Sequence, residues 1–216
     1  MNDVAHQGPK RGADRAVLLA HGAGADMHAA ALTTVADALA AAKIPSLRFN
    51  FPYKAAGRRG PDRPPVLEAA LRDAARELAA RAKVPADRLV LGGRSMGGRI
   101  GSMVAAQDGA LGVVLLGYPL HPPGKADQLR VDHFPKLTMP VLFASGTRDA
   151  FGAPDELRLR EAVRQERVGR PPLRVRVSVD RESCEPSGSR DSIFFRSEEG
   201  DPLSSKGEVA STRPLP

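Results

Sequence analysis

The chain of 216 residues has no tryptophan, few aromatic residues (4%) and a single cysteine, Cys184. One cysteine cannot form a disulfide within the chain, and this is typical of proteins from a reducing compartment, so we expect a cytoplasmic location. No apolar run approaches the roughly 18 residues that a membrane-spanning helix needs. The first 15 residues also lack the apolar segment of a secretory signal peptide. We therefore expect no association with a membrane.

Basic residues exceed acidic ones, 32 to 25, which gives a formal net charge of +7 and a pI near 10.1. A nucleic acid is one class of partner for such a chain. However, the arginines are scattered among acidic residues, and the sequence has neither an aromatic stacking platform nor a nucleic-acid-binding motif. We expect no nucleic-acid partner. Histidine, cysteine and carboxylates do not cluster at ligand spacing, so no metal or other cofactor is expected. The sequence says nothing about the oligomeric state.

Short apolar runs alternate with segments of helical periodicity along most of the chain. A continuous apolar run is typical of a strand buried on both faces, as in a parallel sheet. Strands are predicted at residues 16–20, 46–51, 89–91, 112–117, 140–145 and 173–179. Helices are predicted at residues 29–42, 66–82, 97–106 and 155–165. This alternation predicts an α/β fold: a mostly parallel sheet of about six strands with helices on both faces.

The composition divides the chain into three parts. Residues 1–14 are a polar leader without periodicity, and residues 15–179 form the α/β domain. From residue 180 to 216 alanine nearly vanishes and serine, glutamate, arginine, glycine and proline dominate. Two explanations fit this composition: a disordered segment, or translation of the gene in an altered reading frame. Residues 52–65, which contain four prolines, are expected to be a long loop.

The sequence Gly93-Arg94-Ser95-Met96-Gly97 lies between a predicted strand and a predicted helix. A G-x-S-x-G motif in this context is the nucleophile elbow of α/β-hydrolases, a sharp turn that projects the serine hydroxyl. Side chains at positions 93 and 97 would collide with neighbouring elements, so both are glycine. The helix start behind Ser95 carries partial positive charge, and the Met96 amide is free to donate to an oxyanion. We predict that Ser95 is the nucleophile.

The sequence His21-Gly22-Ala23-Gly24-Ala25 follows the first predicted buried strand. In α/β-hydrolases a second oxyanion donor comes from the loop after an early strand. Small residues let the backbone approach a substrate closely. The Ala23 amide is the predicted donor, with the Gly24 amide as the alternative. The other interpretation is that the glycines only form a tight turn, and for His21 we favour a structural role over a catalytic one.

Asp149 comes just after the strand predicted at 140–145, in the sequence Ser-Gly-Thr-Arg-Asp. In the chain order Ser, Asp, His of α/β-hydrolases this is the place of the acid that orients the catalytic histidine. The alternative is a surface-turn aspartate that pairs with Arg148. Asp155 fits the acid less well, because it follows Pro154 at a predicted helix start, where a carboxylate acts as a cap.

The histidine of such a triad is expected after the strand predicted at 173–179, but no histidine follows His133. Residues 180–184 (Asp-Arg-Glu-Ser-Cys) occupy its place. Three explanations stay open. The chain is an inactive relative used for binding, the reading frame changes before the histidine, or a histidine from elsewhere substitutes. His21 and His121 are the nearest candidates for that substitution.

The placed motifs, taken together, resemble small bacterial predicted hydrolases of α/β-hydrolase fold, loosely called dienelactone-hydrolase-like. Relatives of these include the hydrolase-like domain of a chromatin-complex subunit. The matching stretches are 18–25 (LLAHGAGA), 48–53 (RFNFPY), 92–99 (GGRSMGGR), 116–125 (LGYPLHPPGK) and 146–152 (GTRDAFG). The resemblance implies a single domain without a lid and with Ser95 and Asp149 in catalytic positions. Members carry a Gly-Asp-His turn after the last strand, and this chain lacks it.

Two functions follow as hypotheses. The first is a serine hydrolase that acts on a small-molecule ester or thioester by acyl transfer. The second is a non-catalytic binding module that keeps the cleft but has lost the base. His21, His121 and Tyr118 are candidates for residues that line this cleft, although a histidine between prolines such as His121 is more often a rigid loop residue.

Overall fold

The computed structural model describes residues 4–122, 124–146, 149–152 and 156. Ten helices and strands were assigned within these residues, together with two short 3-10 turns, Ala86–Arg88 and Phe134–Lys136. The strands are β1 (Val4–Gln7), β2 (Ala16–Ala20), β3 (Ser46–Phe49), β4 (Leu89–Arg94), β5 (Gly112–Leu116) and β6 (Val141–Ala144). The helices are α1 (Ala30–Ala41), α2 (Pro52–Ala55), α3 (Pro64–Ala82) and α4 (Met96–Asp108).

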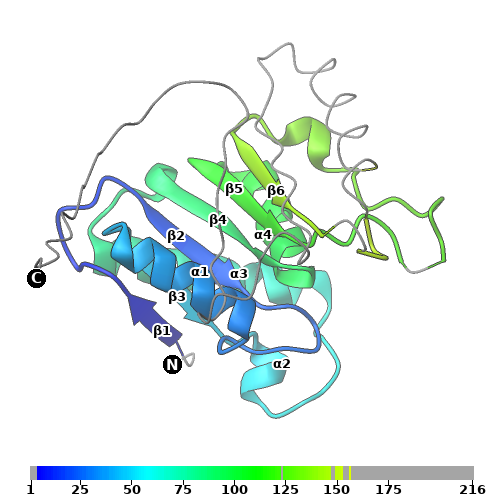
Figure 1. Ribbon diagram of the computed structural model, residues 1–216, viewed down its shortest axis with the longest axis horizontal. Helices are drawn as coiled ribbons and strands as arrows, with labels where there is room; N and C mark the ends of the chain where they lie inside the picture. The colour runs from blue at the N-terminus through cyan, green and yellow to red at the C-terminus, as the bar shows by residue number, and fades with distance from the viewer. Residues whose placement is uncertain (1–3, 123, 147–148, 153–155, 157–216) are drawn as a thin grey trace, which may run out of the picture. The chain divides into compact units, whose positions relative to one another are not determined.

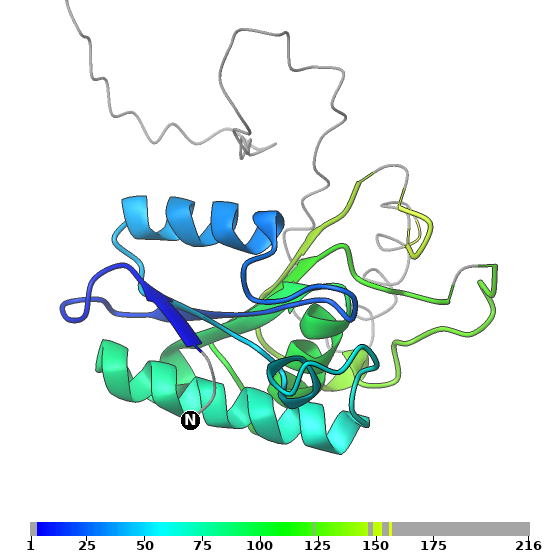
Figure 2. The ribbon, with the colours of Figure 1, turned by 90° about the horizontal axis from the view of Figure 1, so that it is seen from below.

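The strands form one sheet in the order β1-β3-β2-β4-β5-β6. All neighbouring pairs are parallel except β1 and β3, which pair antiparallel at the edge. α1 lies on one face of the sheet, and α3 and α4 lie on the other (Figures 1 and 2). This arrangement confirms the predicted α/β fold with a mostly parallel sheet between two layers of helices.

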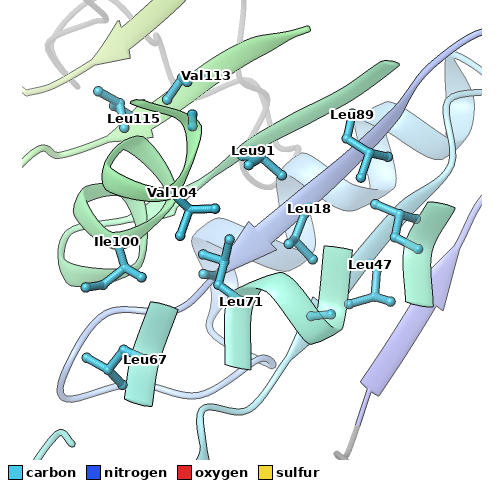
Figure 3. Close-up of a cluster of buried hydrophobic side chains, with 14 of the residues drawn as sticks. Leu18, Leu47, Leu67, Leu71, Leu89, Leu91, Ile100, Val104, Val113 and Leu115 are labelled. Atoms are coloured by element: carbon cyan, nitrogen blue, oxygen red, sulfur yellow. The ribbon is translucent and has the colours of Figure 1, made fainter. Parts of the chain in front are cut away.

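The larger core lies between the sheet and the helices α3 and α4. Leu18, Leu47 and Leu91 of the sheet face side chains of these helices, and each of these leucines is buried (Figure 3). The apolar residues of α3 recur every three or four positions, as a helix with one buried face requires; its buried members are Leu67, Ala70, Leu71, Ala74, Leu78 and Ala82. A smaller cluster under α1 includes Val17, Leu19, Leu32 and Ala36.

Two segments differ from the prediction. Residues 4–7 of the expected leader form β1, which pairs with β3 through backbone groups. The side chains of β1 have no apolar pattern that would have predicted a strand. The expected loop at 52–65 contains α2, which begins at Pro52 because proline is favoured in the first helical turn. The described sheet therefore has six strands, the predicted number, because it includes β1, which was not predicted. The strand predicted at 173–179, the helix at 155–165, Asp155 and the tail after residue 180 lie outside the described residues.

The chain runs from β2 to β3 on one side and then returns to β4 on the other side of β2. The direction of the strand order therefore reverses between β2 and β4. In open α/β sheets the loops that follow two strands on either side of such a reversal run in opposite directions. The crevice between these loops, at the carboxyl ends of the strands, is where ligands bind. Here these loops are His21–Asp26, after β2, and the turn at Ser95, after β4.

Candidate active site

Ser95 lies between the end of β4 and the start of α4, with φ 51° and ψ −118°. A positive φ at a non-glycine residue costs about 1–3 kcal/mol and persists only where the surrounding structure imposes it. Here the Ser95 N–H donates to the Leu116 carbonyl of β5 at 2.9 Å, and the Ser95 carbonyl accepts from Arg99 N–H at 3.0 Å. The strand, turn and helix predicted around Ser95 are all present, and Ser95 itself is partly exposed.

The two glycines of the motif sit against the backbone of β2. A Cβ built on Gly93 would lie 2.0 Å from the Ala20 carbonyl oxygen, and one built on Gly97 would lie 2.3 Å from the same oxygen. No side-chain atom fits at such distances, and Gly93 also has φ +148°. The close approach of β2 to this turn brings the loop that follows β2 beside Ser95.

The loop after β2 passes close to the serine at Gly22. A Cβ built on Gly22 would lie 3.5 Å from the Ser95 Cβ, which is ordinary van der Waals contact. The next two residues, Ala23 and Gly24, are exposed. Met96 is the first residue of α4, and the amides of a first helical turn have no partner within the helix. Met96 thus follows Ser95 directly, and Ala23 and Gly24 follow Gly22, which lies close to Ser95. The role of these three amides as oxyanion donors stays a prediction.

Asp149 lies on the far side of β5 from the oxyanion loop. Its Oδ2 atom would be 3.1 Å from a Cβ built on Gly117, the residue after Leu116, and Gly117 has φ +58°. Its Oδ1 atom accepts from Phe151 N–H at 3.0 Å. Because the Leu116 carbonyl accepts from the Ser95 amide, the predicted nucleophile and the predicted acid lie beside adjacent residues at the end of β5.

His21 is fully buried, and both of its ring nitrogens face backbone groups. Nδ1 lies 2.8 Å from the Gly22 carbonyl oxygen, and Nε2 lies 3.1 Å from the Phe51 amide nitrogen. A carbonyl only accepts and an amide only donates, so Nδ1 carries the proton and the ring is neutral. Burial lowers the pKa of His21 below its ordinary value. A ring whose two nitrogens are both occupied cannot accept the proton of Ser95.

His121 and Tyr118 follow β5 and pack beside the turn that carries Asp149. His121 is 6% exposed; its N–H donates to the Phe151 carbonyl at 3.2 Å, and its Nδ1 donates to the Pro122 carbonyl at 2.9 Å. Its Nε2 lies 3.5 Å from Glu156 Oε1. Tyr118 is fully buried, its hydroxyl donates to the Arg130 carbonyl at 2.6 Å, and burial raises its pKa. A cleft-lining role for either residue stays a prediction.

Two residues near these elements had no role in the sequence analysis. The Tyr53 hydroxyl donates to the Ala23 carbonyl at 2.8 Å, so it holds the predicted oxyanion loop. The sequence feature that pointed to Tyr53 was the stretch 48–53, which resembles the family but had been assigned no role. His133 Nε2 lies 2.7 Å from the Ser102 hydroxyl of α4, and burial, with Arg99 nearby, lowers the pKa of His133 to about 4.

Two further kinds of site are absent from the described part of the chain. Within those residues, no three His, Cys, Asp or Glu side chains are grouped so that they would hold a metal ion. None of the described helices combines the length and apolar character that crossing a membrane requires.

Solved structures with this arrangement of strands and helices come from several organisms. A serine hydrolase homologue from Coxiella burnetii has a TM-score of 0.62 and 19% identity, over 81% of this chain and 80% of that chain. The Xanthomonas campestris protein XC6422, described as an α/β serine hydrolase without lid, has a TM-score of 0.57 and 22% identity, over 81% and 78%. Est1E from Butyrivibrio proteoclasticus, solved with ferulic acid, has a TM-score of 0.61 and 13% identity, over 81% and 85%.

At these identities the structural likeness establishes the fold. The family model described as an alpha/beta hydrolase domain matches residues 13–169, which is well over half of the chain. The match includes β2 to β6, the Ser95 turn, the loop after β2 and Asp149. The chain therefore belongs to the alpha/beta hydrolase domain family, with the fold of a hydrolase.

Proposed function

We propose that the protein is a serine hydrolase that cleaves a small ester or thioester by acyl transfer. The observation that carries the proposal is the conformation of Ser95, a strained turn between β4 and α4 that lies close to Gly22 of the loop after β2. Strain of this kind is found where function requires it. In support of the proposal, the first turn of α4 follows the strained residue directly, and Ala23 and Gly24 of the loop after β2 are exposed.

In the proposed reaction the Ser95 Oγ adds to the acyl carbon, while a base takes the hydroxyl proton. The carbonyl oxygen becomes an oxyanion that accepts from the amides of Met96 and Ala23, with the Gly24 amide as the alternative. The C–O or C–S bond then breaks, and the leaving group takes the proton from the base. Water, deprotonated by the same base, attacks the acyl-enzyme and restores the Ser95 hydroxyl. The base is a histidine that Asp149 would orient and whose charge it would stabilise.

No histidine is assigned as the base, and this keeps a second candidate function open. That function is a binding module that retains the site but does not catalyse turnover. Both nitrogens of His21 are occupied, and no histidine follows His133 in the sequence. A chain that has lost the base loses several orders of magnitude in rate but keeps its ligand-binding groups. Translation of the gene beyond codon 160 in the other two frames tests the altered-frame explanation, since a Gly-Asp-His followed by an amphipathic helix would complete the triad.

A fluorophosphonate probe distinguishes the two functions, because it reacts with a serine that is activated as a nucleophile. We expect labelling of the folded protein at Ser95, located by peptide mass spectrometry, and its complete loss in Ser95→Ala. Ser102→Ala is the matched control, because Ser102 is a buried serine on the same helix, and it should keep the labelling. Absence of labelling and of ester turnover in the wild-type chain would contradict the enzyme and support the binding module.

A further inference from the structure

The direction of an oxyanion donor depends on the peptide group to which it belongs. In a trans peptide the C=O of one residue and the N–H of the next point in opposite directions in one plane. Whatever holds the carbonyl therefore aims the amide. In the loop after β2, the amide of Ala23 shares a plane with the Gly22 carbonyl, and the amide of Gly24 shares a plane with the Ala23 carbonyl.

The Gly22–Ala23 peptide is held by His21. The Gly22 carbonyl accepts from His21 Nδ1 at 2.8 Å and from the Ala25 N–H at 3.1 Å. The imidazole cannot turn away, because the Phe51 N–H donates to its Nε2 at 3.1 Å and the ring is fully buried. The carbonyl thus faces the buried ring, and the Ala23 amide faces the opposite, exposed side.

The next peptide, Ala23–Gly24, is held by Tyr53. The Ala23 carbonyl accepts from the Tyr53 hydroxyl at 2.8 Å, and the tyrosine is fully buried at the start of α2. The rings of Tyr53 and His21 are neighbours, with centroids 5.9 Å apart. Two consecutive carbonyls are therefore held by two adjacent buried side chains, and the Gly24 amide is directed away from Tyr53.

The far end of the loop is held from the same stretch of chain, residues 48–53. The Met27 N–H donates to Asn50 Oδ1 at 3.0 Å, and the Met27 carbonyl accepts from Arg48 Nη1 at 3.1 Å. Together with Phe51 and Tyr53, these contacts make four hydrogen bonds between this stretch and the segment His21–Met27. The loop is thus fixed along its length before any ligand arrives, which is what electrostatic stabilisation of an oxyanion requires.

The protonation states of both holding groups suit this role. Burial lowers the pKa of His21, so the ring stays neutral with its proton on Nδ1. Burial also raises the pKa of Tyr53, so its hydroxyl keeps the proton that it donates. Both groups remain donors to their carbonyls across the neutral pH range.

We propose that Tyr53 and His21 are positioning residues, which hold the Gly22 and Ala23 carbonyls so that the Ala23 and Gly24 amides face the reacting carbonyl at Ser95. This inference rests on the proposed function. It also explains why the stretch 48–53, which contains neither the nucleophile nor the acid, is bound to the loop at four points.

The test is Tyr53→Phe, which removes only the hydroxyl and keeps the buried ring. Removal of a whole oxyanion donor costs about 100- to 1,000-fold in rate. Here the donor stays but is free to tilt, so we expect a loss of about tenfold. With the fluorophosphonate probe, the maximal labelling rate should fall while the half-saturating probe concentration stays within about twofold. A defect in probe binding or in overall folding would not lower the maximal labelling rate while leaving the half-saturating probe concentration unchanged.

Ser102→Ala is the matched control, because it deletes another buried hydroxyl that donates to a backbone carbonyl, that of Arg99 at 2.8 Å. Thermal unfolding of both variants separates loss of stability from loss of rate. Equal labelling rates in Tyr53→Phe and wild type, with Ser95-dependent labelling present in both, would overturn the positioning role alone. Absence of Ser95-dependent labelling in the wild type would overturn the proposed function and, with it, the positioning role.

Discussion

The loop after β2 and the turn after β6 reach the same edge of the sheet, but they are held differently. Side chains from β3, α2 and the residues between them bind the backbone of the first loop, through Arg48, Asn50 and Tyr53. In the described part of the second turn, Asp149 makes local bonds: its N–H donates to the Gly146 carbonyl at 3.1 Å, and its Oδ1 accepts from Phe151. The loop on the nucleophile side is thus held by side chains from distant parts of the chain. In the described residues, the acid turn is held by its own local bonds and by a backbone bond from the His121 N–H to the Phe151 carbonyl.

The difference also concerns how much of each region is described. Within the described residues, the groups that bond to Ser95 and to the loop after β2 lie between His21 and Leu116. The acid turn borders residues 153–155 and 157–216, which lie outside the described residues and in which the family resemblance places the missing histidine. The contrast predicts a large effect on stability from a change at Gly97, where β2 packs against the Ser95 turn, and a small effect from a change at the open position Gly146 of the acid turn.

The largest effect is expected from Gly97→Ala compared with Gly146→Ala. The new Cβ at residue 97 would lie 2.3 Å from the Ala20 carbonyl oxygen, so backbone has to move, at a cost of about 3 kcal/mol or more. At residue 146 no atom of the described residues lies within 4 Å of the new Cβ, and the free energy of unfolding should change by less than about 0.5 kcal/mol. Urea unfolding of both variants measures the difference. Similar losses in the two variants would show that the two turns are equally tight.

A smaller effect is expected from acid, through His133 on the segment that joins β5 to β6. Its Nε2 bonds to the Ser102 hydroxyl, and the charged groups near it are Arg99 on α4 and Asp132 on its own segment. Burial is the main cause that lowers its pKa to about 4, from 6.5. The unfolded chain takes up the proton first, so stability is full above pH 6.5 and falls as the pH approaches 4.

After an allowance for solvent screening, we expect this loss to be on the order of 1–2 kcal/mol. His133→Gln keeps an amide group for Ser102 and does not titrate, so the unfolding free energy of this variant should depend less on pH between 6.5 and 4. His21 and His6, whose pKa values burial also lowers, contribute to the dependence that remains. The measurement is urea unfolding at a series of pH values. An unchanged slope in His133→Gln would show that His133 does not control the acid sensitivity.

The sequence predicted the elements that have a repeating apolar pattern or a diagnostic turn. The strands β2 to β6 and the helices α1, α3 and α4 were expected within a few residues, because burial imposes a period on their side chains. The Gly93 and Gly97 positions were expected from the geometry of a strand-to-helix turn, and the Ala20 backbone supplies the predicted collision. β1 was missed, because an edge strand of four partly exposed residues has no such pattern.

The residues that orient the site were less predictable. Tyr53 and Asn50 act on Ala23 and Met27, and these pairs are 30 and 23 residues apart in the chain. Hydrogen bonds between a side chain and a distant backbone group leave no period or spacing in one sequence. The sequence did mark the stretch 48–53 through its resemblance to the family, but only the folded chain shows which backbone groups it binds. The catalytic roles of Ser95 and Asp149 stay predictions.

The most direct test of the account is a crystal structure of the protein after reaction with a fluorophosphonate. The covalent phosphonyl group on Ser95 imitates the tetrahedral intermediate, and its free oxygen stands in for the oxyanion. The account predicts that this oxygen lies about 2.7–3.1 Å from the amide nitrogens of Met96 and of Ala23 or Gly24. An adduct whose oxygen points into solvent, or a probe attached to another residue, would contradict it.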